Sequence, residues 1–112
     1  PTNYFFALYD ANRNLLAQSA NQTTTVWAAN TVKTLAMTTP YRIPTTGLYY
    51  IGLLQVATTI ATIAGGPAKL NAAFVANAPI LHGTSTTGLT TALPTPAAAI
   101  TAGTASIYAS VS

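Results

Sequence analysis

Ionisable side chains are scarce in this chain, and their scarcity limits both its fold and its chemistry. Charged residues make up 4% of the 112 residues, against about 25% in an ordinary soluble domain. The only acid is Asp10, the bases are Arg13, Lys33, Arg42 and Lys69, and the only histidine is His82. The surface must be built from Thr, Ser, Asn, Gln and Ala, which solvate a protein but resist close association poorly. We therefore expect the chain to work packed against neighbours.

The composition favours one folded domain. Hydrophobic residues reach 50% and the net charge is only +3, the opposite of the pattern found in disordered chains. A chain of 112 residues fits a single domain over residues 1–112 and buries about 65% of its extended-chain surface. The chain enters an apolar segment directly from Pro1, without a Met or a signal-peptide pattern. We expect it to be a fragment of a longer protein.

Nucleic acid and membrane are not expected partners. The sequence pI of about 9.5 reflects missing acids, and four scattered cations do not form a phosphate-binding track. Residues 48–66 carry no charge, but Gln55 and three threonines dilute this stretch and no basic flank orients it. The absence of cysteine excludes disulfides and fits a cytosolic protein or a virion assembled in the host cytoplasm.

Turn residues and apolar runs predict several short strands. Residues 3–9 are rich in aromatic side chains, residues 10–14 supply a turn, and residues 15–18 return, which predicts a hairpin over residues 4–18. We expect Asp10 to cap this turn. A further strand is expected at 31–38, and an extended edge segment at 41–43 between Pro40 and Pro44.

The stretch 48–56 is apolar in both of its alternating sets of side chains. An exposed face would alternate with polar residues, so we expect this strand to be covered on one side by the core and on the other by a loop or another subunit. Residues 4–9 have the same two-sided character.

The remaining segments are less regular. Residues 57–64 and 70–76 suit either strand or short helix, 65–67 reads as a turn, 83–96 as a long loop, and 104–111 as a closing strand. Short strands separated by turn signals predict an all-β fold, an antiparallel β-sandwich of jelly-roll-like form.

The side-chain inventory argues against catalysis. A single carboxylate cannot supply the paired acids of glycoside hydrolysis or the oxygen cage of a Ca²⁺ or Mg²⁺ site, and zinc ligands are lacking. A triad of His82, Asp10 and a serine lacks the Gly-x-Ser-x-Gly elbow. We expect no enzyme activity, no metal and no cofactor, with His82 in a structural role.

Aromatic residues are the candidate recognition groups. An aromatic ring offers apolar area that stacks on a sugar, and Trp27 and Tyr41 are the best ligand-binding candidates because they adjoin loops. Core or interface packing is the commoner role of aromatic residues in strands. The residues expected to serve it are Tyr4, Phe6, Tyr49, Tyr50, Ile51 and Leu53.

The order of these segments resembles a known family. It is carried by Phe6-Ala7-Leu8-Tyr9-Asp10, Asn14-Leu15-Leu16-Ala17-Gln18-Ser19, Trp27, Lys33-Thr34-Leu35-Ala36, Pro40-Tyr41 and Gly47-Leu48-Tyr49-Tyr50-Ile51-Gly52-Leu53. It is similar to a β-sandwich module of tail and other virion proteins of bacteriophages, particularly those infecting actinobacteria. The resemblance spans residues 4–54, with a weaker match at 106–110, and Arg13 stands where the family often has a turn glycine.

The resemblance implies an architectural and adhesive role. We expect a non-enzymatic virion module of a tail fibre, tail tip or head decoration that docks against copies of itself, for example as a trimer, and against other virion proteins. The family usually has one or two further strands before the first one seen here. The alternative is a carbohydrate-binding module that recognises a bacterial cell-wall glycan through Trp27 and neighbouring tyrosines; the two roles are compatible.

Overall fold

The chain folds into strands and irregular segments. The computed structural model describes residues 3–23, 25–63, 65–66, 83–102, 106–107 and 109. The longer strands in this part are β1 (Asn3–Tyr9), β2 (Leu15–Gln18) and β3 (Tyr50–Val56), and no helix is found there. Four two-residue strands follow, β4 (Gly65–Gly66), β5 (Gly83–Thr84), β6 (Thr101–Ala102) and β7 (Ser106–Ile107). The prediction of an all-β chain is confirmed.

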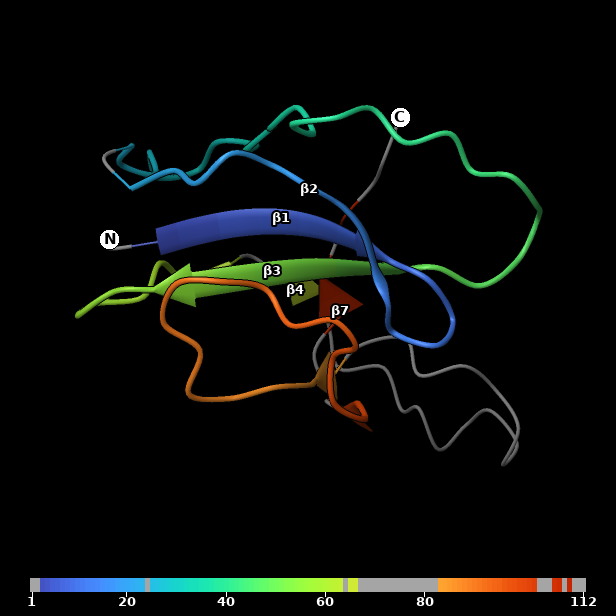
Figure 1. Cartoon of the computed structure of the whole chain (residues 1–112). Helices are drawn as coiled ribbons and strands as arrows, with labels where there is room; N and C mark the ends of the chain where they lie inside the picture. The colour runs from blue at the N-terminus through green and yellow to red at the C-terminus, as the bar shows by residue number, and fades with distance from the viewer. Residues whose placement is uncertain are drawn as a thin grey trace.

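The main sheet has three antiparallel strands in the order β2-β1-β3. Strands β4 and β7 form one separate pair, and β5 and β6 form another. Figure 1 shows the main sheet between two irregular layers, residues 20–48 on one side and residues 83–102 on the other. Over the described residues the structure is thus a three-stranded antiparallel sheet with a layer on each face and two short strand pairs, and the sandwich stays a prediction.

Strand β1 is the centre of the core. Every residue of β1 except Phe6 is buried, and Ala7 is completely inaccessible. A strand with neighbours on both edges and layers on both faces must be apolar in both alternating sets, as Tyr4–Tyr9 is. The two-sided cover predicted for residues 4–9 is confirmed.

The β1–β2 hairpin is built by its turn residues. Asp10 accepts backbone hydrogen bonds from Asn12 and Asn14 through Oδ1, at 2.9 and 2.8 Å, and Arg13 N–H donates to Asp10 O at 2.9 Å. Arg13 has a φ of 66°, the left-handed conformation that follows the turn in hairpins of this length. The hairpin and the capping role of Asp10 are confirmed, and Arg13 occupies a position that suits glycine.

Several local predictions are wrong. Residues 31–38 form no strand, because Val32 projects into solvent and only a single bridge, Ser19 with Met37, ties this segment to β2. Residues 41–43 are exposed and outside any ladder, and 57–63 are neither strand nor helix. Gly65–Gly66 was expected in a turn but pairs with β7.

Other predictions are tested only in part. Residues 83–96 are a loop apart from β5, and β7 lies within the predicted closing strand 104–111. Segment 70–76, Lys69, His82 and Tyr108 lie outside the described residues. Within the part that the structure describes, no helix is long and apolar enough to cross a bilayer.

Buried Ser19 replaces a main-chain partner at the end of β2. Its side chain is 1% exposed, and its Oγ accepts the Phe6 N–H at 3.0 Å and donates to Ala20 O at 3.2 Å. We expect Ser19→Ala to lower the free energy of unfolding by about 1–3 kcal/mol, because it leaves a buried N–H without a partner. Urea unfolding measures this. Ser85→Ala removes an exposed hydroxyl bond, and an equal loss in both variants would contradict the assignment.

Candidate interaction surface

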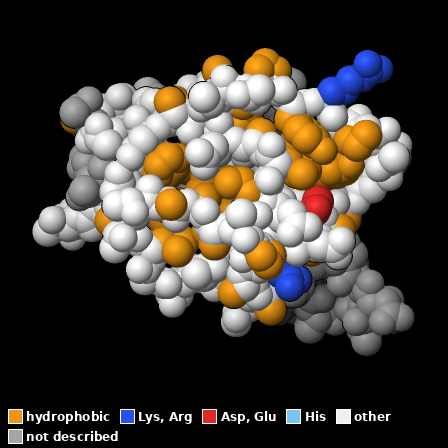
Figure 2. Space-filling view, in the orientation of Figure 1, with side chains coloured by type: hydrophobic (Ala, Val, Ile, Leu, Met, Phe, Trp, Pro, Cys, Tyr) orange, Lys and Arg blue, Asp and Glu red, His pale blue; other side chains and the backbone are white. Residues whose placement is uncertain are grey.

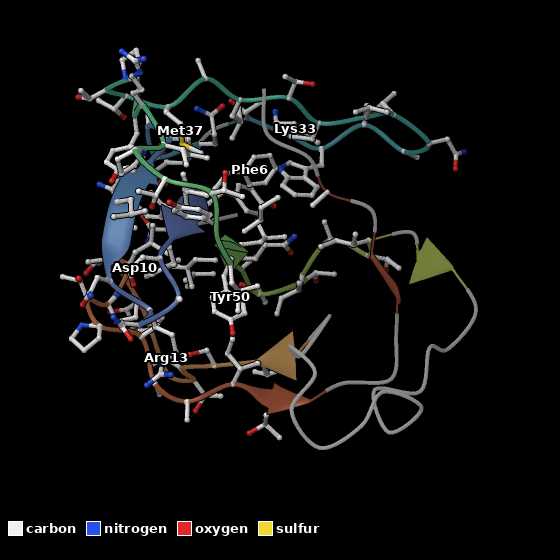
Figure 3. All side chains as sticks on the ribbon, turned by 90° about the vertical axis from the view of Figure 1, so that its right-hand side faces the viewer. Phe6, Asp10, Arg13, Lys33, Met37 and Tyr50 are labelled. Atoms are coloured by element: carbon white, nitrogen blue, oxygen red, sulfur yellow. The ribbon has the colours of Figure 1, made fainter. Side chains whose placement is uncertain are left out.

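The register of β1 and β3 assigns their side chains to two faces. Residues paired directly across antiparallel strands point to the same side of a sheet. The pairs Tyr4–Gln55, Phe6–Leu53 and Leu8–Ile51 define one side, here called the Phe6 face. The pairs Asn3–Val56, Phe5–Leu54, Ala7–Gly52 and Tyr9–Tyr50 define the other, the Tyr9 face. Figure 3 shows Phe6 and Tyr50 pointing to opposite sides of the sheet.

The Tyr9 face is closed by the layer of residues 83–102. The Tyr9 hydroxyl donates to Pro94 O at 3.1 Å, and Asn3 Nδ2 donates to Thr90 O. Burial raises the pKa of Tyr9. Arg13 and Ala97 are linked twice, by Arg13 Nε to Ala97 O at 3.0 Å and by Ala97 N to Arg13 O at 2.8 Å. This layer is bonded to both ends of β1 and to the hairpin turn, so the Tyr9 face is internal.

Trp27 covers part of the Phe6 face. Its ring centroid lies 5.0 Å from that of Tyr4, with the planes tilted by 31°, and 6.1 Å from that of Phe6 in an edge-to-face contact. The indole is half-buried, and its Nε1 is enclosed without a hydrogen-bond partner among the described residues. In this structure Trp27 is a packing residue, and Tyr4 and Phe6 are its partners, as expected for core candidates.

The Phe6 face is open at two residues of β3, although Leu8 on the same face is buried. Ile51 is 44% exposed and Leu53 is 39% exposed, although both lie in the middle of a seven-residue strand. The expected second cover for residues 48–56 is therefore not supplied by the described part of the chain. Figure 2 shows one side of the molecule, with orange apolar areas set in white; the charged side chains visible in this view lie in its right-hand half.

Tyr41, the second ligand-binding candidate, lies on a different surface. It is 40% exposed and lines a groove of about 330 Å³ that runs along the outer side of β2. The other lining residues are Leu15, Leu16, Ala17, Gln18, Thr38, Thr39 and Pro40. Trp27 packs on the Phe6 face, so the structure does not bring the two candidates into one site.

The two tyrosines before and at the start of β3 have separate roles. Tyr49 is half-buried and donates its hydroxyl to Thr45 O at 2.9 Å. Tyr50 is also half-buried and belongs to the Tyr9 face. Both contribute to packing within the chain, as core residues do.

The single carboxylate is committed to the hairpin turn. Asp10 Oδ1 accepts from the Asn14 and Asn12 N–H groups, and Oδ2 accepts from Asn14 Nδ2 at 3.0 Å. The hydrogen bonds from Asn14 lower the pKa of the Asp10 carboxyl, and the bond from Asn12 contributes less to this lowering. Figure 3 places Lys33 well away from Asp10. Within the described ranges, no three His, Cys, Asp or Glu side chains gather to hold a metal ion.

Asp10 makes the stability of the fold weakly dependent on pH in the acid range. Its folded pKa lies below the unfolded value of about 3.9, so its contribution is fully present above about pH 4 and lost as the pH falls through the folded pKa. Because Asp10 is the only acidic side chain, we expect a small fall in melting temperature between pH 5 and pH 2, measured by circular dichroism, and a smaller one in Asp10→Asn. A large acid transition in both proteins would contradict this.

Comparison with protein-family models, curated proteins and solved structures finds no match for this chain. The resemblance to phage virion modules therefore stays a prediction, and the site is interpreted from its own geometry.

Sequence reasoning missed two features of the structure. Gln55 is the only polar side chain in strand β3, and both of its amide atoms are enclosed without a hydrogen-bond partner in the described structure. The position of this single glutamine among apolar residues could have been noticed in the sequence. The Arg13–Ala97 link joins residues 84 positions apart, and no local sequence pattern predicts it.

Proposed function

We propose that this chain is a non-enzymatic structural module of a bacteriophage virion, which assembles through uncharged surfaces with copies of itself and with other virion proteins. The observation that carries the proposal is the open part of the Phe6 face, where Ile51 and Leu53 are exposed in the middle of a strand. Exposed apolar side chains on a contiguous surface mark interaction sites.

The distribution of charge supports this proposal. Residues 43–68 contain no charged side chain, so no charge borders the exposed residues of β3 along the chain. The cores of protein interfaces are depleted in charged residues. The only acid is held by its own turn, which leaves no carboxylate for bond-breaking chemistry.

The finer architecture that we propose is an antiparallel, jelly-roll-like sandwich. The pairs β4–β7 and β5–β6 support it, because both are antiparallel and lie outside the three-stranded sheet. Double-sheet folds of this kind protect strand edges and are common in virion proteins.

Multi-angle light scattering of the full chain over a range of concentrations tests the proposal. We expect the mass to rise with concentration to a defined multiple of 11.5 kDa. A stable, folded monomer at high concentration would contradict the proposal, as would release of soluble products from bacterial envelope by the purified chain.

A second role is attachment to a cell-wall glycan. Tyr41 favours it, because its exposed ring lines the groove beside β2 and can stack on a sugar. We expect Tyr41→Ala to weaken binding on an array of bacterial glycans by about tenfold, whereas Val32→Ala leaves it unchanged. The same binding in both variants, or none in the wild type, would contradict this role.

A further inference from the structure

The two edges of the main sheet differ in their protection. The β2 edge is interrupted by a bulge beside Tyr9, and the Ser19–Met37 bridge and a bond from Thr38 N to Gln18 O cover its end. Strand β3 pairs with β1 over seven residues in unbroken register and has no proline, lysine or bulge. These are the devices by which proteins normally block an edge strand. Among the described residues, the β3 edge has none of these devices.

The main-chain groups that face this edge follow from the hydrogen bonds of β1. The main chains of Tyr4 and Phe6 bond toward β2, through Gln22 N to Tyr4 O and Ser19 N to Phe6 O. Alternate residues of an antiparallel strand direct both main-chain groups to the same side. Phe5 and Ala7 therefore bond toward β3, to Leu54 and Gly52.

The remaining residues of β3 direct their main chains outward. Ile51, Leu53 and Gln55 alternate with the residues that bond to β1, so their N–H and C=O groups face the free edge. No described residue forms a hydrogen bond with them there. Ile51 and Leu53 are also the exposed side chains of the Phe6 face. Unpaired main-chain groups and exposed apolar side chains thus coincide on the same residues.

We propose that two copies of the chain pair β3 with β3 in antiparallel orientation, joining their sheets into one. A two-fold axis at Leu53 places Leu53 opposite Leu53 of the second copy, and Ile51 opposite Gln55. All the outward main-chain groups of these three residues then find partners. The inference rests on the proposed function and names the surface through which copies associate.

The absence of charge on β3 and β1 favours a second copy of the chain as the partner of the β3 edge. Under two-fold symmetry a strand meets itself, so any charged residue near the axis faces the same charge. Strand β3 and its neighbour β1 carry no charge at all. The pairing also sets the exposed side chains of Ile51 and Leu53 beside those of the other copy on the same face, which reduces the apolar area they expose to water.

Amide hydrogen exchange of the wild-type full chain tests this pairing without any substitution. We expect the amides of Ile51, Leu53 and Gln55 to become protected as the concentration rises, while those of Gly52 and Leu54 are protected throughout. Protection of all five at concentrations where the chain is monomeric would show that its own residues cover the edge, and would overturn the proposal.

Leu53→Lys supplies the complementary test, because it places two lysines face to face at the axis. We expect it to weaken the dimer by about tenfold or more, whereas Val32→Lys, at an 89% exposed site, leaves it unchanged. A trimer, or an oligomer unaffected by Leu53→Lys, would overturn the β3 pairing and leave the proposed function standing. A monomer at all concentrations would overturn both.

A cysteine at the axis reports the register. The chain has no cysteine of its own, and hydrogen-bonded residues across antiparallel strands have Cα atoms about 5.5 Å apart, within disulfide range. We expect Leu53→Cys to form a disulfide-linked dimer under mild oxidation and Val32→Cys to remain mostly monomeric. Equal cross-linking of the two variants would contradict a two-fold axis at Leu53.

Discussion

Phe5→Ala is expected to lower the free energy of unfolding by about 3–5 kcal/mol, the range for removing a buried aromatic side chain. Phe5 is 7% exposed and stands opposite Leu54 on the internal Tyr9 face, in the strand that has neighbours on both edges. Since domains of this size are stable by about 5–15 kcal/mol, the variant loses a large part of its stability.

Urea unfolding followed by Trp27 fluorescence measures this loss. Trp27 is the only tryptophan and contacts Tyr4 and Phe6 of the same strand, so it reports on the packing of β1. The control is Tyr41→Ala, which removes an exposed aromatic ring and is expected to change stability by less than about 0.5 kcal/mol. Similar midpoints for the two variants would show that β1 is not the centre of the core.

Gly52→Val is expected to destabilise the fold by about 1–3 kcal/mol through overpacking. A Cβ at Gly52 would lie 3.0 Å from Tyr9 Cε2, 3.4 Å from Tyr9 Cδ2 and 3.5 Å from Ala7 Cβ. The Tyr9 ring is buried, and its hydroxyl is bonded to Pro94 O. The ring therefore cannot withdraw without breaking the link between β1 and the layer of residues 83–102.

A double-mutant cycle with Tyr9→Ala checks the cause of this loss. If the Tyr9 ring is the obstacle, Gly52→Val should destabilise the Tyr9→Ala background much less than the wild type. Gly47→Val is the matched control, because a Cβ there meets only Tyr49 Cε2 at 4.0 Å. Equal losses from Gly52→Val in both backgrounds would place the strain elsewhere.

The hairpin was predictable because its determinants are local. Asp10 and Asn14 supply side-chain hydrogen bonds that build the turn whatever surrounds it, and the apolar content of β1 and β3 required strands. The left-handed conformation of Arg13 was not predicted from the residues, and its two hydrogen bonds with Ala97 depend on a segment far along the chain.

The failed predictions share a different cause. Residues 31–38 have apolar residues at strand-like positions, yet Val32 finds no neighbour to cover it and the segment keeps a single bridge to Ser19. Strand formation there depends on a pairing partner that sequence alone does not supply. The packing of Trp27 on Tyr4 and Phe6 was likewise not predictable, because the sequence shows only that Trp27 adjoins a loop, and its ligand-binding role stays a prediction.

Sedimentation equilibrium of the full chain at low and high salt tests most directly the claim that this protein works through uncharged contact. Salt screens interactions between exposed charges, over about 10 Å at 0.1 M, but does not weaken apolar contact or strand pairing. We predict reversible association with a constant that stays the same or rises with salt. Association that weakens steeply with salt, or a chain that stays monomeric in both buffers, would contradict the claim.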